Sequence, residues 1–192
     1  MFGELAVVAG NQPKRKALTA PAPASLDPEE KEEEEEGMAE IQQWCVVEPA
    51  EDCDVRLAVR EHGIGLRCNR RDLRRLQSGL LDVFLGTGQS TFWMAKGWFK
   101  DSLVFEYVWG QLLVSDSGPA TEDVNLALDS MHALDLLHLY HMPLYTRLKA
   151  VLVAQAPDLP SDKVLAAAER FRMPELLPIA ARTIAREWSR AN

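Results

Sequence analysis

The chain has 192 residues, enough for one domain of ordinary size plus a tail, and 47% of them are hydrophobic, enough for a core. No apolar run approaches the ~18–20 residues that span a bilayer, and the opening residues lack the basic start of a secretory signal, so we expect no membrane association. The three cysteines fit neither a zinc pattern nor a disulfide framework, which indicates reduced thiols and a cytoplasmic and/or nuclear protein.

Residues 1–38 predict a disordered acidic tail. They hold nine acidic and four basic residues, so a net charge of −5 out of the chain's −8 lies there. A Pro- and Ala-rich stretch is followed by the run EEKEEEEE, and neither can bury apolar surface. A solubilising leader is the simplest interpretation, and a docking tail for a basic partner is the alternative. The sequence PKRK at 13–16 is compatible with a nuclear import signal.

The folded part is expected to begin near Ala39. Residues 54–68 carry β-branched and apolar side chains broken by His-Gly-Ile-Gly, which is typical of a β-hairpin. The next segment, 69–86, has a helical pattern with Asn69 placed to cap its first turn. Its apolar residues recur at helical spacing on one face: Leu73, Leu76, Leu80 and Phe84.

A third strand and a short helix are expected next. Residues 90–95, STFWMA, have the composition of a strand. Residues 101–113 predict a mostly buried helix that starts at Asp101 or Ser102, and the Asp101 side chain is suited to cap it.

Two helical hairpins, each with Met-Pro at its corner, complete the chain. We expect Thr121 to cap the first helix and the helix to end near His141, because Pro143 disfavours helix before it and suits the first turn after it. Ser161 is expected to cap the third helix, and Pro174 marks the second corner. If the pattern repeats, four leucines should be buried: Leu134, Leu137, Leu165 and Leu176. An apolar ridge is expected along one side of the last helix, formed by Leu176, Ala180, Ile184 and Trp188.

This order of elements resembles the BTB/POZ family. The motifs that carry the resemblance are DVRLAV at 54–59, VFEYVWGQLL at 104–113 and LLHLYHMPLYTRL at 136–148. The resemblance implies an α+β fold, BTB/POZ-like, with a small mixed sheet and a cluster of helical hairpins in residues 39–155. Residues 156–192 would then form a three-box or BACK-like helical extension.

The function implied by the resemblance is protein–protein interaction, including the role of a cullin-type ubiquitin ligase substrate adaptor. In the family, an apolar residue and a glutamate before the short helix contact the cullin, and Phe99 and Asp101 take these positions here. The expected partner-binding residues come from this stretch and the first Met-Pro corner: Phe99, Asp101, Phe105, Tyr140, Met142 and Pro143. A homodimer is a further expectation from the family, although the weakly helical segment before Asp54 leaves a monomer open as the alternative.

Two alternatives stay open, and the sequence predicts no enzyme, cofactor or metal site. One alternative is a stand-alone oligomerisation or scaffold module without a ligase role, and the other is a nuclear nucleic-acid-associated factor. Nucleic acid is disfavoured, because the chain is acidic and its arginine cluster at 67–75 has no interleaved aromatic residues. His138 and His141 could face one metal, but histidines at a helix corner are the simpler interpretation. GTGQS at 86–90 lacks the third glycine of a dinucleotide loop.

Overall fold

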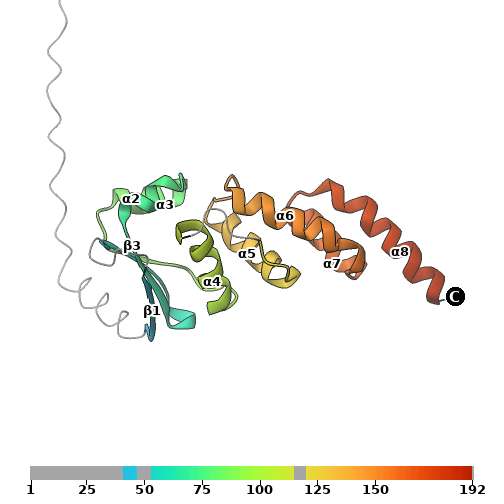
Figure 1. Ribbon diagram of the computed structural model, residues 1–192, viewed down its shortest axis with the longest axis horizontal. Coiled ribbons are helices and arrows are strands. Elements are labelled where there is room, and N and C mark those ends of the chain that lie inside the picture. The colour runs from blue at the N-terminus through green and yellow to red at the C-terminus, as the bar shows by residue number, and fades with distance from the viewer. Residues whose placement is uncertain (1–40, 47–52, 115–119, 192) are drawn as a thin grey trace, which may run out of the picture.

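The computed structural model describes residues 41–46, 53–114 and 120–191. The tail predicted for residues 1–38 lies outside the described residues. The described part has an α+β fold, with a small mixed sheet at one end and the helical hairpins reaching away from it to the C-terminal helix at the other (Figure 1). No helix within these ranges is long and apolar enough to cross a membrane.

The sheet has four strands in the order β1-β3-β2-β4. Their bounds are β1 Gln43–Val46, β2 Val55–Val59, β3 Ile64–Cys68 and β4 Thr91–Trp93. β2 and β3 form the predicted antiparallel hairpin, joined by the 3-10 turn η2 (Arg60–His62), and β4 confirms the third strand, parallel to β2. β1 pairs parallel with β3 and was not predicted from the sequence.

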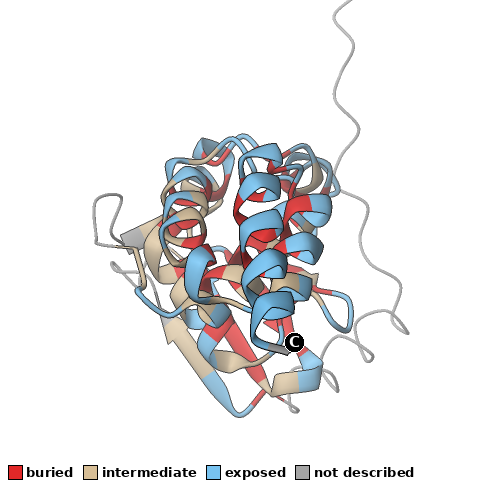
Figure 2. Cartoon of the chain, turned by 90° about the vertical axis from the view of Figure 1, so that its right-hand side faces the viewer, coloured by how far each residue is buried: buried red, intermediate tan, exposed pale blue. Residues whose placement is uncertain are grey.

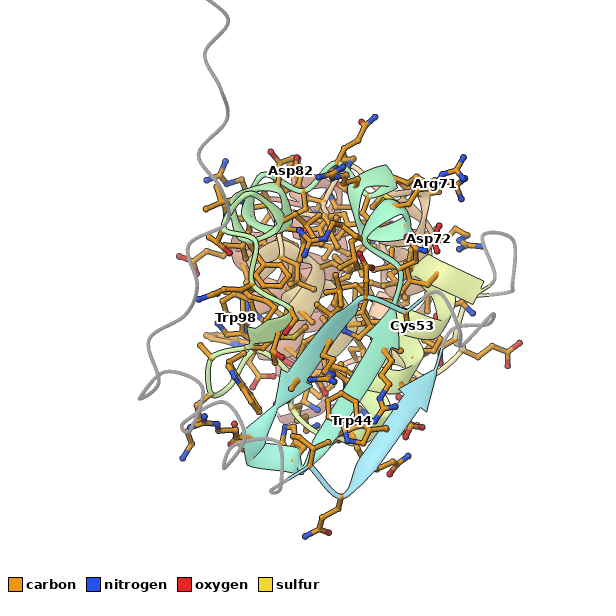
Figure 3. All side chains as sticks on the ribbon, turned by 90° about the vertical axis from the view of Figure 1, so that its left-hand side faces the viewer. Trp44, Cys53, Arg71, Asp72, Asp82 and Trp98 are labelled. Atoms are coloured by element: carbon orange, nitrogen blue, oxygen red, sulfur yellow. The ribbon has the colours of Figure 1, made fainter. Side chains whose placement is uncertain are left out.

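The two faces of the sheet have different cover. The inward face is buried against helices, whereas the outward face carries Trp44 of β1 and has no helix of the described ranges in front of it (Figure 3). A Cβ atom at Gly65 would lie 2.4 Å from the Trp44 ring, so glycine at this position lets the ring lie against β3. The guanidinium of Arg67 lies 5.2 Å from the centre of the same ring. This close approach attaches β1 to the hairpin.

The segment predicted as one helix, residues 69–86, is two helices. α2 spans Arg70–Arg75 and is capped by Asn69 as predicted, and α3 spans Gly79–Gly86. The helical conformation is interrupted at Gln77, whose φ is +52°. Ser78 then caps α3, and its hydroxyl donates a hydrogen bond of 2.6 Å to the Leu137 carbonyl oxygen. The break therefore fixes this helix pair to the first helical hairpin.

The remaining helices follow the predicted order. Their bounds are α4 Ser102–Trp109, the π-helical turn η3 Gly110–Val114, α5 Val124–Leu136, α6 Pro143–Gln155, the 3-10 turn η4 Ala156–Asp158, α7 Ser161–Arg170, the 3-10 turn η5 Pro174–Leu176 and α8 Leu177–Ala191. α5 packs on α6 and α7 packs on α8, so the two helical hairpins are confirmed.

Three boundary predictions were wrong. Asp123, not Thr121, caps α5, while the Thr121 hydroxyl accepts a hydrogen bond from the Asp123 backbone N–H. α5 ends at Leu136, before His141, because the chain turns left-handed well ahead of the proline. Ser161 is the first residue of α7 rather than its cap, and its hydroxyl donates to the Glu187 carboxylate at 2.7 Å.

The core runs from the sheet into both hairpins, and exposed residues cover most of α8 (Figure 2). Leu134, Leu137 and Leu176 are fully buried as predicted, but Leu165 is 40% exposed. The ridge predicted along α8 begins buried and ends exposed, with Trp188 at 72%. A step of four residues turns about 40° around a helix, so a long i, i+4 ridge rotates away from the face that packs.

Candidate interaction site at the helix corners

The residues predicted to bind a partner separate into an interior group and a surface group. Phe99 and Phe105 belong to the interior, with exposed fractions of 1% and 0%, and their ring centres are 5.1 Å apart in an edge-to-face arrangement. His62 Nε2 donates a hydrogen bond of 2.8 Å to the Phe99 carbonyl oxygen, which holds this stretch against the β2–β3 turn. The ring of Phe99, which was expected to contact a partner, instead packs inside the core.

Asp101 acts as the helix cap that the sequence allowed. Its Oδ1 atom accepts a hydrogen bond of 3.0 Å from the Val104 backbone N–H at the start of α4. This bond satisfies one of the amide groups that the first turn of a helix leaves without a partner.

The surface group lies at the corner between α5 and α6. Tyr140 is 61% exposed, Pro143 is exposed as the first residue of α6, and Met142 is half-buried before it. His141 Nε2 donates a hydrogen bond of 2.9 Å to the Leu76 carbonyl oxygen, which ties the corner to α2. This corner is therefore a fixed, accessible surface with an aromatic side chain at its edge.

Both hairpins end their first helix with the same turn. After α5, His138 has φ +57°, and the Leu139 N–H donates to the Leu134 carbonyl oxygen at 2.7 Å. After α7, Arg172 has φ +50°, and the Met173 N–H donates to the Ala168 carbonyl oxygen at 2.9 Å. This is the Schellman turn, in which glycine is the usual left-handed residue.

The two turns flank one pocket of about 590 Å³, here called the corner pocket. Its walls come from the end of α5, the first corner, α6, the end of α7 and the turn after α7. The lining residues are Asp135, His138, Tyr140, Tyr145, Thr146, Lys149, Arg170, Phe171 and Arg172. Of the predicted partner-binding residues, only Tyr140 lines it. Three cations and two further aromatic rings in the same pocket were not singled out from the sequence.

Arg170 also lines a smaller groove of about 260 Å³ between α5 and α7. There its guanidinium donates to Nδ1 of His132, which requires a neutral imidazole. Burial, and then the Arg170 charge, lower the pKa of His132, while Asp135 and Asp129 act in the opposite direction. The contact joins the two helical hairpins.

Three further sets of titratable groups were considered in the sequence: metal ligands, cysteine thiols and the arginine cluster. Within the described ranges, no group of three or more His, Cys, Asp or Glu residues is placed to hold a metal ion. Burial raises the pKa of the Cys68 thiol to about 12, so this thiol is not nucleophilic near neutral pH. In the arginine cluster, Arg70 pairs with Asp54 at 3.4 Å and donates to the Leu85 carbonyl oxygen, so at least this arginine has a structural role.

No model of a known protein family matches the chain, and no curated protein matches it. The likeness to BTB/POZ proteins therefore rests on motifs and element order alone.

Proposed function

We propose that the protein is a protein–protein interaction module that binds a peptide segment of its partner in the corner pocket. The observation that carries this proposal is the pocket itself, about 590 Å³ in volume, with the exposed Tyr140 at its edge and walls from both helical hairpins. Aromatic and arginine side chains are the residues that protein interfaces most often use as anchors.

A site built between two hairpins has a further property that supports the proposal. The backbone on both sides is fixed by hydrogen bonds, from His141 to Leu76 and within the two Schellman turns. A peptide would therefore meet a preformed surface and lose less free energy in ordering the protein.

A cullin scaffold is one partner of this class that the resemblance suggests. It would have to reach Tyr140, Met142 and Pro143, since Phe99 and Phe105 lie inside the core. Binding of a cullin amino-terminal domain to the whole chain, and its loss in Tyr140→Ala, would support this partner. A wild-type chain with no cullin affinity would remove the adaptor role and leave the interaction module.

The proposal is tested by selecting random peptides displayed on phage against the purified chain. Thr146 is exposed on α6 and lines the pocket, so Thr146→Trp should fill the space and abolish enrichment of the selected peptides. Ala95→Trp adds the same ring at an exposed position that is not part of the pocket lining, and should bind them as wild type does. Equal enrichment on Thr146→Trp and on wild type would contradict the proposal.

Self-association through α8 is a second candidate, favoured by a separate observation. Leu177, Ile184 and Trp188 are exposed and are spaced seven and four residues apart, so they form one apolar stripe as in a helical seam. Light scattering should then report a dimer that Trp188→Lys converts to a monomer, and a monomeric wild type would exclude it.

A further inference from the structure

The corner pocket concentrates positive charge in a chain that is acidic overall. Lys149 comes from α6, Arg170 from α7 and Arg172 from the turn after α7, and Asp135 is the one carboxylate among the lining residues. The lining thus has a net charge of +2, against −8 for the whole chain.

These cations are not neutralised by neighbouring carboxylates. The ion pairs Arg70–Asp54, Arg75–Asp72 and Lys100–Asp129 lie elsewhere in the described ranges, and none of the three involves a pocket residue. Arg170 contacts the neutral His132, and the charge of Lys149 lies 5.3 Å from the centre of the Tyr145 ring. A bound anion would therefore not have to displace an existing acidic partner.

Aromatic rings give these charges a weakly polar background. Tyr145 and Phe171 are each at least nine-tenths buried, and the Arg170 guanidinium lies 5.8 Å from the centre of the Phe171 ring. Such contacts hold a cation in place without consuming its hydrogen-bonding capacity. Charges near apolar walls also act on a ligand more strongly than charges surrounded by water.

The backbone at two lining residues is unusual in a way that points to the same site. His138 and Arg172 both have positive φ at a helix end where glycine would be unstrained. Residues held in such conformations cluster at functional sites. Here each left-handed position places a long or ionisable side chain in the wall of one pocket, which glycine could not do.

We propose that the corner pocket binds the phosphate group of a phosphorylated side chain in the partner, through Lys149, Arg170 and Arg172. This inference rests on the proposed function and specifies its ligand. A phosphomonoester carries a charge of about −1.5 to −2 at neutral pH, which the net charge of the lining matches. The guanidinium groups offer paired donors to phosphate oxygens, and the exposed Tyr140 ring is placed for contact with the rest of the peptide.

A simpler explanation exists for both arginines, and the experiment has to distinguish it from phosphate binding. Arg170 and Arg172 lie at the C-terminal end of α7, where a positive charge complements the helix dipole whatever the pocket binds. In that case their replacement would change stability and leave anion binding unaffected.

The test is a titration of the whole ¹⁵N-labelled chain with phenyl phosphate, followed by two-dimensional NMR, with inorganic phosphate and benzoate as comparison ligands. We expect saturable shifts confined to amides of the pocket-lining residues, with phenyl phosphate binding more tightly than either comparison ligand. Lys149→Gln and Arg172→Gln should each weaken phenyl phosphate at least about tenfold, because each removes a charged hydrogen bond. Arg182→Gln, at an exposed position on α8 that is not part of the lining, is the matched control and should bind as wild type does. Thermal melting of each variant verifies that it is folded.

Three outcomes would overturn the inference. They are an absence of saturable shifts, equal binding of phenyl phosphate and inorganic phosphate (an unspecific anion site), and unchanged binding in a less stable Arg172→Gln (a dipole role only). If phage peptides still require the open pocket while phenyl phosphate fails, the interaction module is retained and only the phosphate is lost. If both fail, the corner pocket is not a binding site.

Discussion

The corner between α5 and α6 spans residues 137–142, whereas the corner between α7 and η5 spans only 171–173. In the first corner, the chain turns left-handed at His138 and continues through Tyr140 before Pro143 opens α6 directly. In the second, Arg172 turns the chain and Pro174 follows almost at once, opening a 3-10 turn before α8. The feature that both corners share is the left-handed residue with a buried apolar residue after it. The Met-Pro pair only marks where the next helical segment begins.

This difference changes how the two hairpins correspond. The Met-Pro pairs begin at residues 142 and 173, 31 positions apart, whereas the left-handed residues 138 and 172 are 34 apart. Matching by Met-Pro pairs Leu134 with Leu165, but the Schellman turns pair Leu134 with Ala168. Both of those residues are buried, whereas Leu165 is 40% exposed. The corners also differ in what they expose, because only the longer one has room for an aromatic side chain at the surface.

The largest effect on stability is expected at the buried residue that follows the left-handed residue in each corner. Leu139 and Met173 follow the left-handed residues and are both fully buried, so Leu139→Ala and Met173→Ala should each lower the free energy of unfolding by about 2–5 kcal/mol. Leu165→Ala is the matched control and should cost less than about 1 kcal/mol. Urea denaturation measures all three. A small loss at one corner and a large loss at the other would show that the two turns do not contribute equally to the free energy of unfolding.

A smaller change in stability, an increase rather than a loss, is expected when the strained left-handed residues are replaced by glycine. Glycine adopts positive φ without the crowding that a Cβ atom causes, so His138→Gly and Arg172→Gly should each raise the free energy of unfolding by about 1 kcal/mol. Gln77→Gly should gain a similar amount at a left-handed residue that does not line the corner pocket. Urea denaturation again provides the measurement. Destabilisation at both corners would mean that these side chains make contacts worth more than the strain.

Much of the fold was predictable because its signals are local. The hairpin at 54–68, the cap at Asn69 and the proline at the start of α6 each follow from short-range chemistry. β1 was not predictable in this way, since it depends on a tryptophan reaching a glycine in a strand some twenty residues later. The break at Gln77 was also missed, because a left-handed residue other than glycine leaves no pattern in the sequence.

The residues that line the candidate site differ in how far the sequence pointed to them. Tyr140 was named from the sequence, because it stands in the Met-Pro motif that carries the family resemblance. Phe99 was misplaced, because an aromatic residue before a helix cap looks the same whether it faces solvent or the core, and only packing decides. Arg170 and Arg172 belong to the end of α7, which reaches the pocket beside the first corner only in the tertiary structure, so sequence spacing could not place them with Tyr140.

The smallest effect concerns the contact between the hairpins and depends on pH. His132 accepts a hydrogen bond from Arg170 only when its imidazole is neutral, and its pKa in the folded protein is lowered from about 6.5. The unfolded chain therefore binds a proton at this site more readily than the folded one. The contribution of His132 to the free energy of unfolding should therefore be fully present above pH 6.5 and decline as the pH falls through this value. Because His132 is only partly buried, solvent screening should keep the loss below about 1 kcal/mol.

His132→Gln isolates this contribution from the other histidines. The glutamine amide oxygen can accept from Arg170 at every pH, so the variant should lose less stability than wild type between pH 7.5 and 5.5, values chosen to bracket the titration. Urea denaturation at both values gives the difference, in which the contributions of His62, His138 and His141 cancel. Arg170→Gln should flatten the pH dependence as well, because it removes the charge that opposes protonation of the imidazole. Equal pH dependence in wild type and His132→Gln would show that the contact between the hairpins does not depend on this proton. In that case contacts other than the Arg170–His132 pair would hold the two corners together.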